Sequence, residues 1–105
     1  MIYITVEDFL QKTATLPRLD RCQEKQLALQ KDHQALVNGY LHFVAGAVKR
    51  APANIRNLRT VYACIKTLED CVERFDFQQD SEPFSHRLSW ALRQCITRRI
   101  ADPDT

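Results

Sequence analysis

The chain has 105 residues, a formal net charge of +2 and 45% hydrophobic residues, which is enough for one domain with a modest core and excludes a disordered chain. Its longest apolar run, Phe43 to Val48, is far too short to span a membrane, and the N-terminus lacks the features of a signal peptide. The four cysteines show no CxxC spacing, so we expect a cytoplasmic protein with reduced thiols.

The composition predicts an all-α fold, a bundle of four to five helices. Only two glycines and four prolines occur, and strong helix formers dominate the sequence. A first helix is expected after Thr5, which can cap it, and the proline within Leu16 to Leu19 would end it. Asp20 can cap a second helix that passes through Cys22 and Leu29.

Two longer amphipathic helices follow. Apolar residues recur at helical spacing from Ala35 to Lys49, and Ala51 to Asn54 ends this helix. Either Asn54 or Asn57 can cap the next helix, expected roughly from Ile55 to Phe75. The apolar stripe of that helix is close to a heptad seam and consists of Leu58, Val61, Tyr62, Ile65, Leu68, Val72 and Phe75.

A last helix is predicted from Phe84 or Ser85 to Ile100. Ser81 or Ser85 can cap it, and Pro83 suits its first turn. Acids precede the helix and arginines fill its last turns, an order that complements the helix dipole. Its apolar stripe is expected to contain Leu88, Ala91, Leu92, Cys95, Ile96 and Ile100.

The only tryptophan, Trp90, lies off this stripe. Its neighbours on the helix surface are His86, Arg93, Gln94, Thr97 and Arg98. Such a face suits nucleic acid, because cations bind phosphates, amide and hydroxyl groups bind base edges, and an aromatic ring stacks on bases. The alternative is that Trp90 packs under a loop or a neighbouring helix and that the arginines form a solvated face.

The same segment carries a motif. Phe84-Ser85, Trp90, Arg93-Gln94, Ile96-Thr97-Arg98 and Ile100-Ala101-Asp102 fit the pattern FS….W..RQ.ITR.IAD. In this the chain resembles region 2 of the sigma-70 family of bacterial RNA polymerase sigma factors. By this resemblance, residues 34–102 correspond to region 2, and residues 1–33 correspond, more loosely, to region 1.2. Residues 103–105 are expected to form a frayed tail.

The resemblance implies a single sigma domain 2-like unit that binds RNA polymerase core through the β′ subunit, and −10 promoter DNA. It places Gln94 and Thr97 at the double-stranded upstream edge of the −10 element, Trp90 against the last intact base pair, and Phe84 in the pocket of a flipped base. Arg93 and Arg98 would contact phosphates. With Arg87, the implied DNA-binding residues are Phe84, Arg87, Trp90, Arg93, Gln94, Thr97 and Arg98.

The chain also departs from the family pattern. Ala91 replaces the second tryptophan of the family, Arg87 replaces a tyrosine, and the loop from Gln78 to Pro83 is acidic where the family is basic. Arg59 to Cys64 replaces the polar residues that meet β′ in the family. The family's regions 3 and 4 have no counterpart, so the resemblance implies a companion protein that supplies them.

No sequence feature indicates catalysis, a cofactor or a small-molecule substrate. There is no phosphate-binding loop or zinc spacing, and the three histidines are scattered. Cys64 and Cys71 are expected to be buried thiols rather than metal ligands. The acids at positions 69, 70, 73 and 76 are expected to form a solvated or partner-facing surface, although a metal site is an alternative.

Three hypotheses follow. The first is a stand-alone sigma domain 2-like transcription protein that binds RNA polymerase core, or a companion sigma-like protein, and promoter DNA. The second is a degenerate sigma-like interaction module, a decoy, scaffold or regulator, that does not open promoters. The third is a helical adaptor that shares only ancestry with sigma factors.

Overall fold

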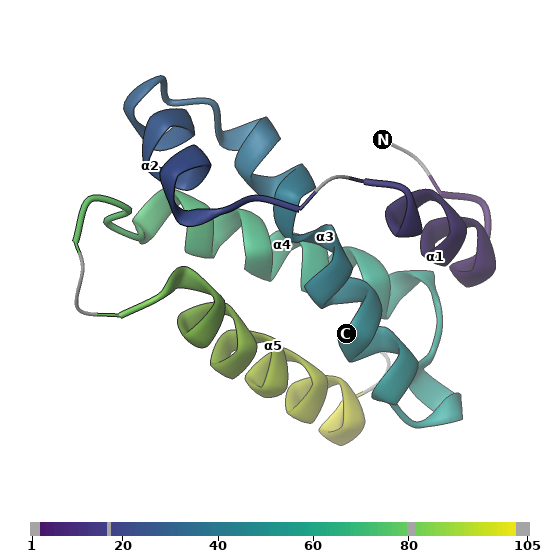
Figure 1. Ribbon diagram of the computed structural model, residues 1–105. Coiled ribbons are helices and arrows are strands. Elements are labelled where there is room, and N and C mark those ends of the chain that lie inside the picture. Colours follow the sequence, from purple (N-terminus) through teal and green to yellow (C-terminus); the bar gives the residue numbers. More distant parts are fainter. Residues whose placement is uncertain (1–2, 17, 80–81, 103–105) are drawn as a thin grey trace.

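The protein is all-helical throughout the part of the chain that the computed structural model describes, which is residues 3–16, 18–79 and 82–102 (Figure 1). This confirms the predicted all-α class; the expected tail, residues 103–105, lies outside the described residues. The elements are α1 (Val6–Ala14), α2 (Arg21–Leu29), α3 (His33–Arg50), the short 3-10 turn η1 (Ala53–Ile55), α4 (Leu58–Arg74) and α5 (Phe84–Ala101).

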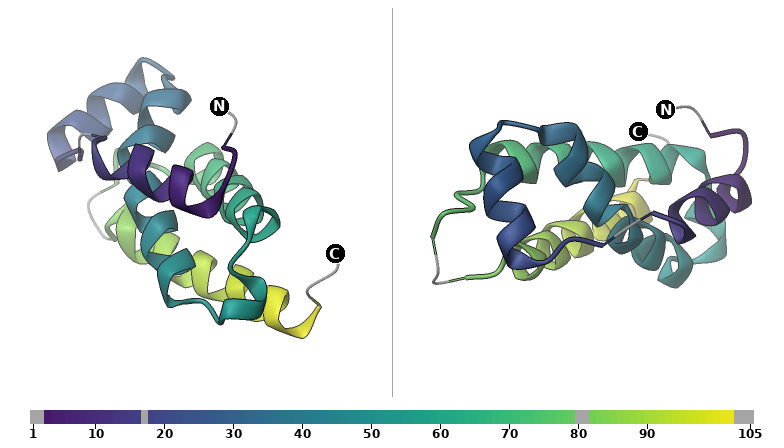
Figure 2. Two further views of the ribbon diagram at one scale, coloured as in Figure 1. Left: turned by 90° about the vertical axis from the view of Figure 1, so that its right-hand side faces the viewer. Right: turned by 45° about the horizontal axis from the view of Figure 1, so that its top comes forward.

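Three long helices form the centre of the molecule. α4 packs along both α3 and α5, and α3 also contacts α5. Both α1 and α2 pack against α3, at opposite ends of the molecule (Figures 1 and 2). Each long helix buries leucines fully, among them Leu36, Leu68 and Leu88. At about 1.5–3 kcal/mol for each large apolar side chain, this burial is the main force that holds α5 in place.

An aromatic cluster closes the end of the core where the α4–α5 loop begins. The ring centroid of Phe84 lies 4.7 Å from that of Tyr40, 5.2 Å from that of Phe75 and 4.9 Å from that of Phe77. Only 1% of Phe84 is exposed. Phe84 is therefore a core residue that anchors the first turn of α5, which corrects its expected place in a base-binding pocket.

Several helix starts follow the predicted capping residues. The side chains of Thr5, Asp20 and Asn57 accept hydrogen bonds from the backbone N–H groups of Asp8, Gln23 and Thr60. The start of α5 differs from the prediction: its N-cap is Pro83, and no side chain caps the helix. Ser85 already lies inside the first turn, and Ser81 lies outside the described residues.

The buried faces of α4 and α5 differ from the predicted stripes at a few positions. Tyr62 and Ile100 are exposed, whereas Thr60 and Arg99 are buried, Arg99 with 5% exposure. Arg99 Nε donates to Thr60 Oγ1 at 3.1 Å, so the buried guanidinium has a polar acceptor on the facing helix. The α4–α5 contact thus includes a polar pair where the apolar pattern placed Ile100.

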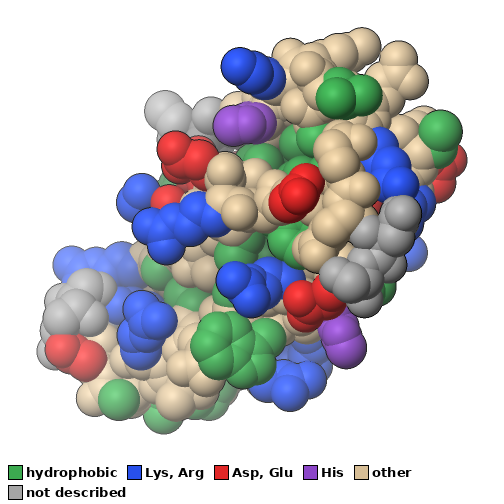
Figure 3. All heavy atoms as spheres, turned by 90° about the vertical axis from the view of Figure 1, so that its left-hand side faces the viewer, with side chains coloured by type: hydrophobic (Ala, Val, Ile, Leu, Met, Phe, Trp, Pro, Cys, Tyr) green, Lys and Arg blue, Asp and Glu red, His purple; other side chains and the backbone are tan. Residues whose placement is uncertain are grey.

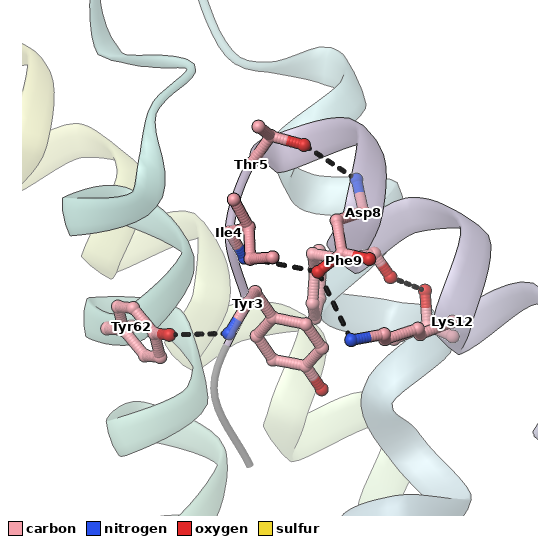
Figure 4. Close-up of polar contacts among 8 residues, drawn as sticks. Tyr3, Ile4, Thr5, Asp8, Phe9, Lys12 and Tyr62 are labelled. Atoms are coloured by element: carbon pink, nitrogen blue, oxygen red, sulfur yellow. Dashed lines mark hydrogen bonds and ion pairs between the residues drawn. The ribbon is translucent and has the colours of Figure 1, made fainter.

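The N-terminal segment is fastened to α4 and to its own helix (Figure 4). Tyr3 N donates to the hydroxyl of Tyr62 at 2.9 Å, and the Tyr3 ring packs edge-on against Phe9. Asp8 accepts from Ile4 N and pairs with Lys12, and these interactions lower the pKa of its carboxyl group. These contacts hold α1 beside α3 and α4.

Leu19 fixes the segment before α2 against α3. It packs directly on Gly39, where a Cβ atom would collide with the Leu19 side chain. The absence of a side chain at Gly39 therefore permits this close approach.

Candidate nucleic-acid interface on α5

The outer face of α5 consists of five exposed side chains at helical spacing: His86, Trp90, Arg93, Gln94 and Thr97. The opposite side of the helix, with Leu88, Leu92 and Cys95, is buried against the core. Trp90 is 61% exposed, so it packs neither under a loop nor under a neighbouring helix. An exposed ring of this size, surrounded by polar groups, is available for stacking.

Two predicted residues are exposed beyond Trp90: Gln94 lies one turn and Thr97 two turns farther along α5. The Thr97 hydroxyl donates to the carbonyl oxygen of Arg93 at 2.9 Å. Its oxygen can still accept a hydrogen bond from a ligand. Gln94 offers both an amide donor and an acceptor, the combination that recognises an adenine edge.

The surface on either side of Trp90 is hollowed. A hollow of about 350 Å³ lies toward the helix start and is lined by Glu82, His86, Arg87, Ser89, Trp90 and Arg93. A second hollow, of about 490 Å³, lies toward α4 and is lined by Asp70, Cys71, Arg74, Phe75, Asp76, Gln79, Glu82, Arg87, Trp90 and Ala91. Because the Trp90 ring borders both, a flat ligand in either hollow could contact it.

The charge differs between these two hollows. Three carboxylates, of Asp70, Asp76 and Glu82, line the α4 hollow together with two arginines, whereas the smaller hollow has one carboxylate. Figure 3 views the side of the molecule that holds the α4–α5 loop, and there basic and acidic side chains alternate around hydrophobic ones. The α4 hollow is therefore a poor path for a phosphate backbone.

A groove of about 410 Å³ runs on the other side of α5, between α5 and α3. Phe43, Ala47, Leu92 and Ile96 form its apolar lining, and Arg50, Ser89, Arg93 and Thr97 its polar lining. None of the described residues that line this groove carries a carboxylate, so the field of this lining favours anions.

From the sequence, Arg50 was not predicted to belong to this site. It is exposed at the end of α3, and its guanidinium lies over Gly46. The signal that could have found it is the absence of acids between His33 and Leu68. Helical periodicity alone could not show that the end of α3 lies beside Arg93.

The predicted set is thus divided by the fold. Trp90, Arg93, Gln94 and Thr97 share the outer face of α5, and the exposed Arg87 and Arg98 flank it. Phe84 is separate, because it is in the core.

The α4 segment that the resemblance assigns to β′ contact is mostly buried. Thr60, Val61 and Cys64 are in the core, and only Arg59 and Tyr62 of positions 59 to 64 are exposed. Lys66, Glu69 and Glu73 continue the exposed stripe along α4. A partner that binds α4 would therefore meet a surface of mixed charge.

Within the described parts of the chain, no three His, Cys, Asp or Glu side chains are grouped so that they could hold a metal ion. The acids at the end of α4 are solvated, and Asp70 pairs with Lys66 at 3.5 Å. The described helices also include none that is both long enough and apolar enough to cross a membrane.

Comparison with models of protein families, with curated proteins and with solved structures finds no match for this chain. The likeness to sigma region 2 therefore rests on the motif in the sequence.

Proposed function

We propose that this chain is a sigma domain 2-like transcription protein that acts in the cytoplasm by binding rather than by catalysis. Its outer α5 face would contact −10 promoter DNA, together with RNA polymerase core or a companion sigma-like protein. The observation that carries the proposal is the common exposure of Trp90, Arg93, Gln94 and Thr97 on one helix face.

Trp90 would supply a stacking surface. A stacked base contributes about 1–3 kcal/mol to single-stranded binding, and a ring that is 61% exposed can receive one without rearrangement of the core. Because Ala91 offers no second ring and Phe84 is in the core, this stacking would depend on Trp90.

Gln94 and Thr97 would read base edges beside this ring. The Gln94 amide can both donate to and accept from adenine, and the Thr97 oxygen can accept from a base amino group. Since Gln94 and Thr97 lie one and two turns from Trp90, a duplex edge could meet them while the adjacent unpaired base meets Trp90.

The phosphate backbone would follow the α3 side of Trp90. Arg50 and Arg93 share the groove there, whose described lining holds no carboxylate, and Arg98 lies five residues beyond Arg93 along α5. Arginines position a nucleic acid through its phosphates without selecting sequence. The carboxylates in the α4 hollow would repel a backbone on the other side and so fix its path.

A second candidate is an interaction module that binds another regulator and does not open DNA. The mixed charges of the α4 hollow, the burial of Phe84 and the altered α4 surface favour it. A protein partner with both signs of charge could bind over α4 and the start of α5, whereas DNA could not.

Titration of a fluorescent forked −10 DNA with the purified protein, with and without RNA polymerase core and at two salt concentrations, tests both candidates. A working sigma fragment should bind in the presence of core, more weakly at high salt. Trp90→Ala should weaken this binding about 5- to 150-fold, the equivalent of one stacked base. Arg50→Ala should reduce the salt dependence by about one phosphate contact.

Lys66→Ala is the matched control, because it removes an exposed cation from α4 and should leave DNA binding unchanged. If Gln94→Ala and Thr97→Ala bind every DNA as the wild type does, base reading by α5 is wrong. Absence of DNA binding with and without core would instead favour the interaction module.

A further inference from the structure

Two cysteine thiols meet inside the α4–α5 contact. Cys64 Sγ of α4 lies 3.8 Å from Cys95 Sγ of α5, although the residues are 31 positions apart in the sequence. Cys64 is 0% exposed and Cys95 is 8% exposed, so only Cys95 reaches the surface. The other two cysteines are elsewhere: Cys22 is exposed on α2, and Cys71 borders the α4 hollow.

The surroundings of the pair favour a thiolate at Cys95. The Cys64 thiol donates to the Cys95 sulfur, which lowers the pKa of Cys95, to about 6, against the opposing effect of burial. The Thr67 hydroxyl and the guanidinium groups of Arg98 and Arg99 lower it further. The same hydrogen bond, together with burial, raises the pKa of Cys64.

The geometry points to Cys64 and Cys95 as a peroxide-sensitive thiol pair that closes a disulfide between α4 and α5. Both sulfurs are already in contact, and the partly exposed Cys95 is the one that a small oxidant can reach. This inference does not depend on the proposed function, since it concerns the inner side of α5.

Two displacements balance the reaction with hydrogen peroxide. The Cys95 thiolate attacks one peroxide oxygen, the O–O bond breaks, and the leaving hydroxide takes a proton to become water, which leaves a sulfenic acid. The Cys64 sulfur then loses its proton and attacks the Cys95 sulfur, and the hydroxyl group leaves as a second water. Two thiols lose two electrons and one peroxide is reduced to two waters.

Closure requires only a small movement. A disulfide has an S–S bond of about 2.05 Å, so the sulfurs must approach by rotation of the side chains and a slight shift of the helices. The bond would tie α5 covalently to α4 at Cys95, the residue that follows Gln94 in α5. Oxidation would therefore fix the helix that carries the outer face without covering that face.

Peptide mapping provides the test, because trypsin places each cysteine in a separate peptide: CQEK, TVYACIK, TLEDCVER and QCITR. The reduced, folded protein is treated with a small excess of hydrogen peroxide, its remaining thiols are alkylated, and the digest is analysed without reductant. We expect TVYACIK linked to QCITR, an intact mass lower by two hydrogens, and reversal by dithiothreitol. Recovery of both peptides in the alkylated form would overturn the inference.

Variants distinguish this pair from general oxidation. A Cys22→Ser/Cys71→Ser protein should still lose two hydrogens, and failure to do so would contradict the assignment. Adding Cys64→Ala to that background should leave a sulfenic acid on Cys95, which dimedone traps, whereas Cys95→Ala should slow the reaction at least about ten-fold. If the Cys95→Ala protein, which keeps Cys64, formed a dimedone adduct on Cys64 as fast as the Cys64→Ala protein forms one on Cys95, Cys95 would be refuted as the attacking thiol. Circular dichroism before oxidation verifies that each variant is folded.

Discussion

At the scale of single residues, Phe84 and Trp90 show that two aromatic side chains on one helix can have different roles. Phe84 begins α5 and is enclosed by Tyr40, Phe75 and Phe77. Trp90 points to solvent and borders both hollows. Helical spacing placed Trp90 on a polar face correctly, but it could not place Phe84, because the neighbours of Phe84 come from α3 and from the α4–α5 loop.

The stability of variants should follow this difference. Phe84→Ala should lower the free energy of unfolding by about 3–5 kcal/mol, because it removes a buried ring and leaves a cavity. Trp90→Ala should change it by no more than about 0.5 kcal/mol, as expected for a position that is 61% exposed. Urea denaturation followed by circular dichroism measures both. Comparable losses in the two variants would mean that Trp90 also supports the fold.

At the scale of helices, the contact between α4 and α5 contains polar and sulfur groups as well as apolar ones. Periodicity predicted the helices and most of their buried residues, including Val61, Leu68 and Leu88. It did not predict that Arg99 would be buried in place of Ile100. An apolar stripe predicts which side of a helix is buried, but the angle at which two helices cross decides which residues meet at their ends. Here the crossing brings Arg99 to Thr60, whose hydroxyl oxygen accepts its hydrogen bond.

The thiol pair should make stability depend on pH in a specific way. The pKa of Cys95 in the folded protein, about 6, is below the roughly 8.5 of an unfolded thiol. The Cys95 thiolate therefore makes its full contribution to the free energy of unfolding above about pH 8.5, and this contribution is lost as the pH falls to about 6. The raised pKa of Cys64 acts in the opposite sense, and its contribution is lost as the pH rises above about 8.5. The stabilisation by the reduced pair should therefore rise between pH 6 and about 8.5 and fall at higher pH.

Comparison with Cys64→Ala/Cys95→Ala isolates this effect, because all other titrating groups are shared. The difference in the free energy of unfolding between the reduced wild type and this variant should have its maximum near pH 8.5. A difference that stays constant between pH 6 and pH 8.5 would show that neither thiol titrates differently on folding.

At the scale of the whole molecule, local signals specified each helix, but the sequence did not reveal how distant segments meet. The capping residues Thr5 and Asp20 are local features that the sequence predicted, and Asn57 was one of the two predicted caps of α4. The groove with Arg50 and Arg93 joins α3 to α5 and required the folded chain. The same is true of Tyr62, which the pattern assigned to the core and which instead binds the N-terminal segment.

The hydrogen bond between Tyr3 N and the Tyr62 hydroxyl provides a test of how α1 is held. Tyr62→Phe removes the acceptor but keeps the ring, and it should lower the free energy of unfolding by about 0.5–1.5 kcal/mol. Hydrogen exchange should accelerate in α1 more than in α4, because the bond joins the N-terminal segment to the core. Tyr3→Phe is the matched control, since it keeps both the ring and the backbone donor. Unchanged exchange of the α1 amides in Tyr62→Phe would mean that the packing of Phe9 and Tyr3 alone holds α1 on the bundle.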